Sequence, residues 1–348
     1  MRIGVIGHFG GSENFTDGQT VKTKTLYDAL KRRIEPDVKI VTADTFYAKR
    51  NPLRFTWELV RTIFSCNQII VLLSSRGRQI LFPVFYYCSK CLKKDIFHYA
   101  IGGRLYREVT EKKNYGKYVG AFRANWVEST ELANNLQNAG IDNAVYLPNF
   151  KHIEPISTVD LPNAFSKPYA FCTFSRVMPE KGIDDAIDAV MEVNRRCGLG
   201  SARLDIYGPI EAGYEESFNS HLEKTNGVCR YCGVIPPNNS VRTLKDYYAL
   251  LFPTHWRHEG IPGTIVDALS SGVPVIARRW QYCDEMLTHG STGYVYDFEQ
   301  PEKLADWISF AIEHKVDVIG MKKNCLEASE KYGEATVMDQ ILCVLQQK

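Results

Sequence analysis

Short apolar runs alternate along the chain with longer stretches of helical period. In the first 150 residues this pattern predicts strands at 3–6, 38–42, 69–73, 96–101, 126–128 and 145–147, and helices near 20–33, 56–64, 79–91 and 130–138. The alternation restarts with strands at 169–174, 203–207, 228–232, 248–252, 275–277 and 293–296. Strands that alternate with helices are typical of parallel sheets covered by helices, so we predict an α/β protein.

The length of 348 residues suits two domains of about 150 residues each. Residues 150–168 contain prolines and show no clear period, which is typical of a linker. We therefore place the domains at 1–152 and 153–332. Two successive doubly wound domains predict a cleft where the carboxyl ends of their strands face each other, the usual ligand position in open α/β sheets.

Composition narrows the class of protein. Hydrophobic residues make up 45% of the chain and charged residues 24%, as in soluble globular proteins, and no apolar run reaches the length of a membrane span. The start MRIGVIGHFGG reads as a first strand rather than a signal peptide. Ten cysteines without a secretory signal favour reduced thiols in the cytoplasm. The two CxxC pairs, Cys88/Cys91 and Cys229/Cys232, are too far apart for a zinc ribbon.

The charge is distributed unevenly. Lys and Arg outnumber Asp and Glu by 22 to 13 in residues 1–150, and are outnumbered by 20 to 27 in the remainder. A basic half attracts anions, whether nucleic acid, a phosphorylated acceptor or an anionic membrane surface. Segments 46–64 and 76–94, rich in basic and aromatic residues, resemble interfacial helices. The alternative is that their apolar side chains face the core while Lys and Arg are merely solvated.

Two cations lie on the loop FSRVMPEKG at 174–182, between a predicted strand and a helix. Arg176 and Lys181 stand five residues apart there, close to a helix N-terminus. Arg forms bidentate bonds to phosphate and Lys adds a point charge, so this loop is a candidate diphosphate receptor. A loop whose charges are only solvated is the alternative.

Two carboxylates flank a glycine-bearing helix start in the segment HEGIPGTIVDALSSGVPVIA. Glu259 and Asp267 lie about two turns apart, and we expect both near one side. Between them the backbone is open at a helix N-terminus, where free N–H groups can bind phosphate and sugar oxygens. The residues of this stretch are Gly260, Ile261, Pro262 and Gly263. Carboxylates suit hydroxyl-rich ligands because each accepts two O–H bonds. An acidic surface helix is the alternative.

A third candidate is the glycine-rich loop after the first strand. It contains Gly7, Gly10, Gly11 and Gly18 ahead of a helix that carries Lys22 and Lys24. Glycines permit close backbone approach to a ligand. The loop has neither GxGxxG nor GxxxxGK[ST], so it is not a dinucleotide fingerprint or an ATPase phosphate loop.

These motifs together resemble glycosyltransferase family 4, the retaining enzymes of GT-B fold. The resemblance covers SRVMPEKG, YGP at 207–209, FPTHWRHEGIPGTIVDALSSGVPVIA at 252–277 and EMLTHGSTGYVY at 285–296, in that order. GQTVKTKTL at 18–26, IGGRL at 101–105 and VYLPNF at 145–150 are similar to a bacterial branch that builds capsular or extracellular polysaccharides.

The resemblance implies roles for these residues. Arg176 and Lys181 would neutralise the donor diphosphate, Glu259 would contact the transferred sugar and Asp267, where relatives more often have Glu, would bind the ribose. The remaining donor-binding residues would be Gly208, Gly260, Ile261, Pro262 and Gly263. The acceptor or phosphate loop would comprise Gly10, Gly11, Gly18, Gln19, Lys22, Gly102 and Gly103. The final helix, 333–348, would pack back on the first domain.

One position departs from the family. Many relatives carry a His or an acid at the end of the strand IFHYAIGG, where this chain has Gly102 and Gly103. His98 falls earlier in the strand, and a core histidine is its alternative reading. No cofactor or metal is expected, since the chain lacks a DxD motif and HWRHE at 255–259 is not HExxH.

We therefore expect a metal-independent hexosyltransferase that moves a hexose from a nucleoside-diphosphate sugar to a saccharide or polyprenyl-diphosphate-linked acceptor. It would act in surface polysaccharide synthesis, in the cytoplasm or at the inner face of the plasma membrane, without nucleic acid as a partner. A nucleotide-sugar 2-epimerase of the same fold and a non-catalytic nucleotide-sugar-binding protein are the alternatives.

Overall fold

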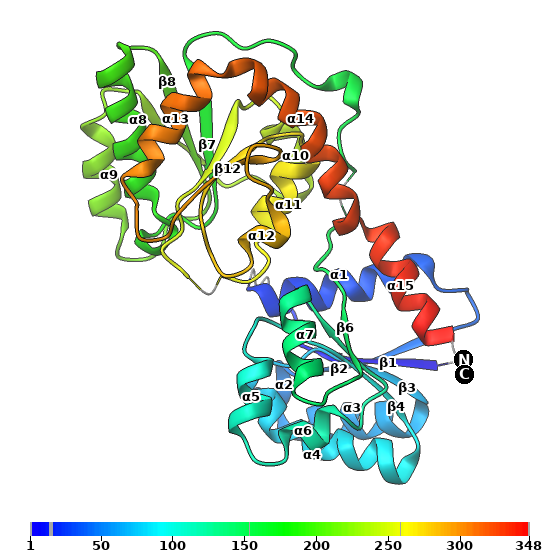
Figure 1. The fold of residues 1–348 in the computed structure, drawn as a ribbon. Coiled ribbons are helices and arrows are strands. Elements are labelled where there is room, and N and C mark those ends of the chain that lie inside the picture. Colours follow the sequence, from blue (N-terminus) through cyan, green and yellow to red (C-terminus); the bar gives the residue numbers. More distant parts are fainter. Residues whose placement is uncertain (1, 14–16, 153, 258, 347–348) are drawn as a thin grey trace. The chain divides into compact units, whose positions relative to one another are not determined.

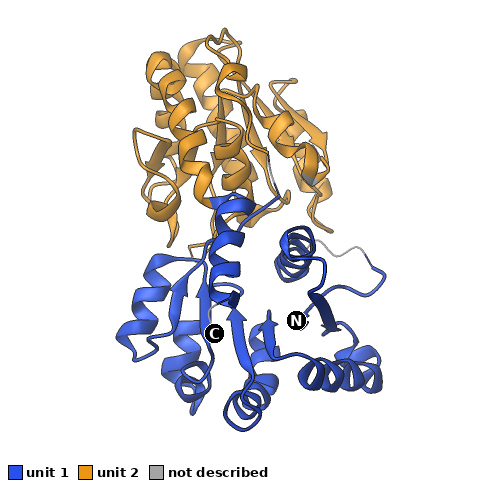
Figure 2. Cartoon of the chain, turned by 90° about the vertical axis from the view of Figure 1, so that its right-hand side faces the viewer, with its two compact units in different colours: residues 1–152, 332–348 blue, residues 153–331 orange. Residues whose placement is uncertain are grey.

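The computed structural model describes residues 2–13, 17–152, 154–257 and 259–346. The chain divides into two compact units, one of Met1–His152 with Tyr332–Lys348 and the other of Ile153–Lys331 (Figure 2). Each unit contains one six-stranded sheet in which all paired strands run parallel. The α/β class predicted from the sequence is confirmed.

The first unit has the strand order β2-β1-β3-β4-β5-β6. Its strands are β1 (Arg2–Gly7), β2 (Lys39–Asp44), β3 (Gln68–Val71), β4 (Asp95–Tyr99), β5 (Ala124–Val127) and β6 (Ala144–Tyr146). Each overlaps a strand that the apolar pattern predicts. The reason is that a parallel strand covered on both faces is apolar throughout, which is a strong local signal.

The helices of the first unit are α1 (Gly18–Arg33), α2 (Tyr47–Arg50), α3 (Pro52–Ser65), α4 (Ser75–Leu92), α5 (Leu105–Glu111), α6 (Tyr115–Val119), α7 (Thr130–Asn138) and α15 (Glu334–Gln346). The sequence pattern found α1, α3, α4, α7 and α15. It missed α2, α5 and α6, because helices of four to seven residues span too few turns to show a period.

Helices cover both faces of the first sheet. One face packs against α1 and α15, and the opposite face against α3 and α4 (Figure 1). The last helix is tied to α1 by the Arg32–Glu334 pair at 2.6 Å and the Arg33–Asp339 pair at 2.8 Å. It therefore belongs to the first unit, although 179 residues of the second unit, Ile153–Lys331, precede it in the chain.

The second unit has the strand order β12-β11-β10-β7-β8-β9. Its strands are β7 (Tyr169–Phe174), β8 (Ala202–Tyr207), β9 (Cys229–Gly233), β10 (Ala249–Phe252), β11 (Val275–Arg278) and β12 (Gly293–Tyr296). Its helices are α8 (Ile183–Cys197), α9 (Glu215–Glu223), α10 (Ser240–Leu244), α11 (Gly263–Ser270), α12 (Cys283–Met286), α13 (Lys303–Glu313) and α14 (Lys315–Ser329).

Both sheets contain a point where the winding direction reverses. In the first sheet the chain passes from β1 to β2 on one side and then to β3 on the other, so the reversal lies between β1 and β3. In the second sheet it lies between β7 and β10. Crossover helices diverge at such points and leave space beyond the carboxyl ends of the strands, which is where α/β proteins bind ligands.

One buried lysine of the second unit lies near the amino ends of β10 and β11. Lys322 of α14 is 1% exposed and donates to the carbonyl oxygens of Tyr247 at 3.1 Å and Gly272 at 3.2 Å. Burial lowers the pKa of Lys322 from 10.5 to about 8. Burial thus disfavours the charged form of Lys322, and the two backbone carbonyl oxygens stabilise that form in part.

This burial predicts a pH dependence of stability. Between pH 8 and 10.5 the unfolded chain binds more protons at Lys322 than the folded chain does, so the free energy of unfolding should rise with pH. We expect the rise to be about 3 kcal/mol relative to Lys322→Met, measured by urea unfolding at several pH values. The exposed neighbour Lys323 gives the control, because Lys323→Met should titrate like the unaltered protein. Parallel curves for the unaltered protein and Lys322→Met would contradict this account.

Candidate functional site

The loops after β7 and β10 meet at the reversal point of the second sheet. The first carries Arg176 and continues through the 3-10 turn Pro179–Lys181 into α8, and the second leads from β10 to α11. The backbone N–H of His255 donates to the carbonyl oxygen of Glu180 at 2.8 Å. Segments about 75 residues apart in the sequence therefore form one edge.

An ion pair joins these two loops. Lys181 Nζ lies 2.7 Å from Glu259 Oε2, and the two side chains are only 13% and 15% exposed. The ammonium also lies 4.2 Å from the ring centroid of Trp256. Thr254 Oγ1 lies 3.4 Å from the same carboxylate oxygen. The pair fixes a cation and an acid at one place, as expected if both contact one ligand.

A glycine allows this close approach. Gly182 has φ of 69°, and a Cβ at this position would lie 2.1 Å from the carbonyl oxygen of Pro253, which follows β10. No side chain fits there without movement of the backbone. Gly182 therefore determines how near Lys181 comes to the loop that carries Glu259.

The loop after β8 supports the same edge. Gly208 has φ of 134°, and a Cβ there would lie 1.8 Å from the carbonyl oxygen of Ser175. Val177 donates its backbone N–H to the carbonyl oxygen of Pro209 at 2.9 Å. These contacts hold the loop of Arg176, whose side chain is 54% exposed and lies 3.9 Å from Glu211.

The start of α11 presents backbone to the site. Pro262 is the N-cap residue and provides no side-chain hydrogen bond, and Gly263 is the first helical residue. Trp280 Nε1 donates to the carbonyl oxygen of Gly260 at 3.1 Å and so fixes the preceding turn. Amides of such a first turn lack partners within the helix and suit an anion.

The two predicted carboxylates differ in exposure. Glu259 lies in the loop and pairs with Lys181, whereas Asp267 lies in α11 and is 3% exposed. The structure thus brings Glu259 together with one predicted cation and places Asp267 in the buried part of the adjoining helix. The assignment of Asp267 to a ribose contact stays a prediction.

Two contributors to this site are not among the residues that the sequence motifs predict. Thr254 and Trp256 contact the Lys181–Glu259 pair, and both lie in FPTHW, directly after a predicted strand. Their position at a strand end was a signal that could have identified them.

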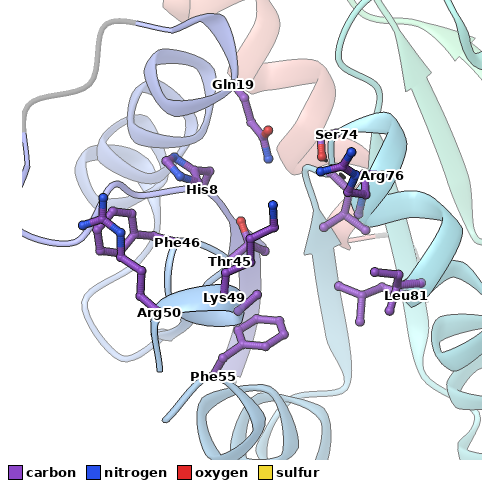
Figure 3. Close-up of a pocket in the computed structure, with 14 residues that line it drawn as sticks. His8, Gln19, Thr45, Phe46, Lys49, Arg50, Phe55, Ser74, Arg76 and Leu81 are labelled. Atoms are coloured by element: carbon purple, nitrogen blue, oxygen red, sulfur yellow. Dashed lines mark hydrogen bonds between the residues drawn. The ribbon is translucent and has the colours of Figure 1, made fainter. Parts of the chain in front are cut away.

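The reversal point of the first sheet holds a cavity of about 440 Å³. Figure 3 shows His8, Gln19 and Lys49 on one side of it and Ser74 and Arg76 on the other. Its apolar wall residues are Phe46, Ala48, Phe55, Leu73, Ile80 and Leu81. The cavity combines polar groups with a larger apolar surface, as ligand sites usually do.

The charged groups of this cavity favour an anion. Among the described residues, Lys49 and Arg76 have no acidic side chain within 4.0 Å, whereas Arg50 pairs with Glu13 and lies over the ring of Phe46. α4 begins at this edge, where the Ser74 hydroxyl accepts a hydrogen bond from the N–H of Gly77 at 3.3 Å. Two available cations and the N-terminal end of an 18-residue helix make the local potential positive.

The predicted acceptor residues fall in different places. Gln19 lines the cavity, and Gly11 lies against Phe46, its backbone N–H donating to Asp44 at 2.9 Å. Gly10 precedes it, and Gly18 is the first residue of α1. Gly102 and Gly103 are exposed after β4 and do not line the cavity. His8, Lys49 and Arg76 do line it and are not among the predicted residues, although Lys49 and Arg76 stand in the basic segments.

Lys22 also lies outside the cavity lining. It is 5% exposed, and Nζ contacts Glu128 Oε1 at 2.5 Å and the carbonyl oxygen of Ala100 at 2.7 Å. Burial lowers the pKa of Lys22, and the charge of Glu128 opposes this shift. The ammonium ties α1 to the ends of β4 and β5 rather than reaching the cavity.

His98 is a core residue. Its ring is completely buried, edge-on to Phe82 at 4.9 Å, with Nδ1 3.3 Å from Asn125 Oδ1. Burial, followed by the charge of Arg78, holds the pKa of His98 well below 6.5, so the ring is neutral. Of the two interpretations of His98, the structure therefore supports the core histidine.

Residues 161–332 match the family described as glycosyl transferases group 1. The matching segment covers just under half of the chain. It contains Arg176, Lys181 and Glu259, so the paired loops described above belong to it.

Known proteins similar to this chain include two curated relatives. The GtfA subunit of the UDP-N-acetylglucosamine–peptide N-acetylglucosaminyltransferase of Streptococcus agalactiae is 26% identical over 167 residues, 48% of this chain and 32% of that protein. The GDP-mannose-dependent alpha-(1-6)-phosphatidylinositol monomannoside mannosyltransferase of Mycobacterium tuberculosis is 26% identical over 151 residues, 41% of this chain and 38% of that protein. The chain thus spans about a third of the length of these relatives.

A solved structure extends the likeness to both units. The HepE protein of Anabaena, solved in complex with UDP, aligns over 99% of both chains with a TM-score of 0.72 and 16% identity. At this identity the likeness shows the fold, which is GT-B, and the fold prediction is confirmed.

Two further observations bear on the expected partners. Among the described residues, no group of three or more His, Cys, Asp and Glu side chains is arranged to hold a metal ion. Within the same ranges, none of the helices combines the length and apolar character needed to span a bilayer. None of the ten cysteines, all of which lie in the described ranges, forms a disulfide.

The glycine that supports the Arg176 loop gives a test of this geometry. Gly208→Ala should lower the free energy of unfolding by more than about 2 kcal/mol beyond Gly227→Ala, measured by urea unfolding. Gly227 is the matched control, because it also has a positive φ, 82°, but its Cβ would meet open space. Equal losses in both variants would mean that the contact with Ser175 does not constrain the loop.

Proposed function

We propose that this chain is a retaining hexosyltransferase that uses a nucleoside-diphosphate sugar. The observation that carries the proposal is the Lys181–Glu259 pair ahead of the start of α11, within a segment that matches group 1 glycosyltransferases and also contains Arg176. The UDP complex of HepE supports a nucleotide-sugar donor.

The donor diphosphate would bind between the loop of Arg176 and the first turn of α11. An ammonium has three donors, so the bond from Lys181 to Glu259 leaves donors for a phosphate oxygen. As the glycosidic bond breaks, negative charge grows on the diphosphate. Arg176, Lys181 and the amides of α11 stabilise that charge, which is the main catalytic contribution in this proposal.

The sugar and ribose would be held by carboxylates. Glu259 accepts hydroxyl groups of the transferred hexose while Lys181 holds its carboxylate in position, and Asp267 receives the ribose. The proposed route is a front-face displacement with retention, in which the departing phosphate takes the proton of the acceptor hydroxyl. Protein cations replace a divalent metal on the leaving group.

The acceptor would bind in the cavity of the first unit. Its cations and apolar walls suit a saccharide linked to a polyprenyl diphosphate, as expected in synthesis of a capsular or extracellular polysaccharide. The name of the mycobacterial relative, a mannosyltransferase acting on a phosphatidylinositol mannoside, supports a lipid-linked acceptor. The enzyme would then work at the inner face of the plasma membrane.

The 2-epimerase and the non-catalytic binding protein are not favoured, because the similar proteins are named glycosyltransferases. They remain distinguishable by experiment. An epimerase converts donor without acceptor, and a binding protein shows neither transfer nor slow donor hydrolysis.

The donor site is tested by Arg176→Ala and Glu259→Ala. After a thermal-shift screen has identified which of UDP, GDP, ADP and TDP sugars stabilises the protein, we expect transfer or donor hydrolysis to fall on the order of 10²–10³-fold in each variant. Arg195→Ala, which removes an exposed cation of α8, should retain full activity. Near-normal turnover of both site variants would remove the assignment.

The acceptor cavity is tested by the double variant Lys49→Ala/Arg76→Ala. Loss of two charged contacts to an anionic acceptor should raise its KM at least about tenfold and leave the thermal shift by the donor nucleotide unchanged. Arg107→Ala on α5 removes an exposed cation outside the cavity and is the control. An unchanged acceptor KM would place the acceptor elsewhere.

A further inference from the structure

The helix α3 exposes a second apolar stripe. Leu53, Trp57, Val60 and Phe64 are 85%, 61%, 46% and 70% exposed. Their spacing of four, three and four residues places them on one side of the helix. The opposite side, with Phe55, Leu59 and Ile63, packs on the sheet. This helix is therefore apolar on two sides, and only one of them faces the core.

The helix α4 repeats the same register. Ile80, Val84 and Tyr87 are 66%, 38% and 63% exposed at the same spacing, and Leu92 near the end is 44% exposed. The buried side again packs on the sheet, through Leu81, Phe82 and Phe85. α3 and α4 cover the same face of the first sheet (Figure 1). We call the outward sides of these two helices the α3/α4 face.

Large exposed apolar side chains concentrate on this face. Of the 18 in the described part of the chain, eight lie on α3 and α4. Scattered apolar residues are ordinary on a protein surface, but a contiguous set marks an interaction site. The face also adjoins the cavity, because Ile80 of α4 lines it.

Positive charge surrounds the face. Residues 46–94 contain nine Lys or Arg and one acid, Glu58. Arg54, Arg61, Arg76, Lys90 and Lys93 are exposed. Arg61 also lies over the ring of Trp57, 5.3 Å from its centroid. The face therefore combines apolar side chains, an exposed Trp and Tyr, and a cationic border.

We propose that the α3/α4 face docks on an anionic lipid bilayer, with its apolar stripes inserted between the headgroups. This inference rests on the proposed function, since a lipid-linked acceptor would enter the cavity beside Ile80. Trp and Tyr prefer the membrane interface, and helices lying in that plane carry Lys and Arg around an apolar side. A second copy of the chain would bring like charge to the same face, which disfavours self-association through it.

Sedimentation with lipid vesicles tests the proposal on the full chain. The protein should bind vesicles that contain phosphatidylglycerol in addition to phosphatidylcholine, and added salt should weaken the binding. Leu53→Ser/Phe64→Ser should reduce the partition coefficient at least about tenfold per residue, because each loses an inserted apolar group. Lys90→Gln/Lys93→Gln should reduce it on the order of tenfold or more.

The second unit offers a matched control. Leu199 and Val316 are 93% and 74% exposed but lie outside the face, so Leu199→Ser/Val316→Ser should leave binding unchanged. Insertion can be detected separately. Lipids with brominated acyl chains should quench the fluorescence of Trp57, and this quenching should be lost in Trp57→Phe. Charge contact alone would not give this quenching.

Three outcomes would overturn the proposal. The first is that the protein does not bind anionic vesicles. The second is that the control variant loses as much vesicle binding as Leu53→Ser/Phe64→Ser. The third is that Leu53→Ser/Phe64→Ser dissociates a dimer in ultracentrifugation while vesicle binding stays intact. The thermal shift by the donor nucleotide is measured on every variant. If the thermal shift persists while vesicle binding is absent, only the docking inference fails. If the unaltered protein shows no thermal shift with any of the nucleotides, the proposed function itself is contradicted.

Discussion

The close contact between the loops after β7 and β10 is the constraint on which the candidate donor site depends. Lys181 and Glu259 are 78 residues apart in sequence and join at 2.7 Å, because β7 and β10 are neighbours in the sheet and Gly182 leaves room for the backbone of Pro253. With a side chain at Gly182 the loops would separate. A cation and an acid at one sheet edge would then become two solvated surface charges, which contribute little.

A reversal point with charged side chains beside it occurs in both units. The first unit places Lys49, Arg76 and the start of α4 around its reversal point, and the second places an internally paired cation and acid at its own. The uneven charge of the two halves follows from this difference in part. The Lys and Arg that line the cavity and those around the α3/α4 face are part of the excess of basic residues before residue 150.

The sequence predicts every strand of both sheets because strands covered on both faces are largely apolar runs. It located Arg176, Lys181 and Glu259 because the carboxyl ends of parallel strands are where chemistry concentrates. It gave Lys22 the wrong surroundings, since a lysine in an amphipathic helix looks identical whether it meets solvent or Glu128. For the same reason it left the outward stripes of α3 and α4 undecided between core and surface: both sides of each helix are apolar.

The sequence by itself determined the α/β class, the twelve strands and the loops that carry the candidate donor groups, because these depend on local period and on strand ends. Only the tertiary structure decided which distant residues meet. Strand order sets Lys181 against Glu259, packs α15 on α1 and assembles the cavity from the ends of β1, β2 and β3. The physical reason is that hydrophobic burial is read from periodicity, whereas pairing between strands far apart in the chain depends on the fold of the whole unit.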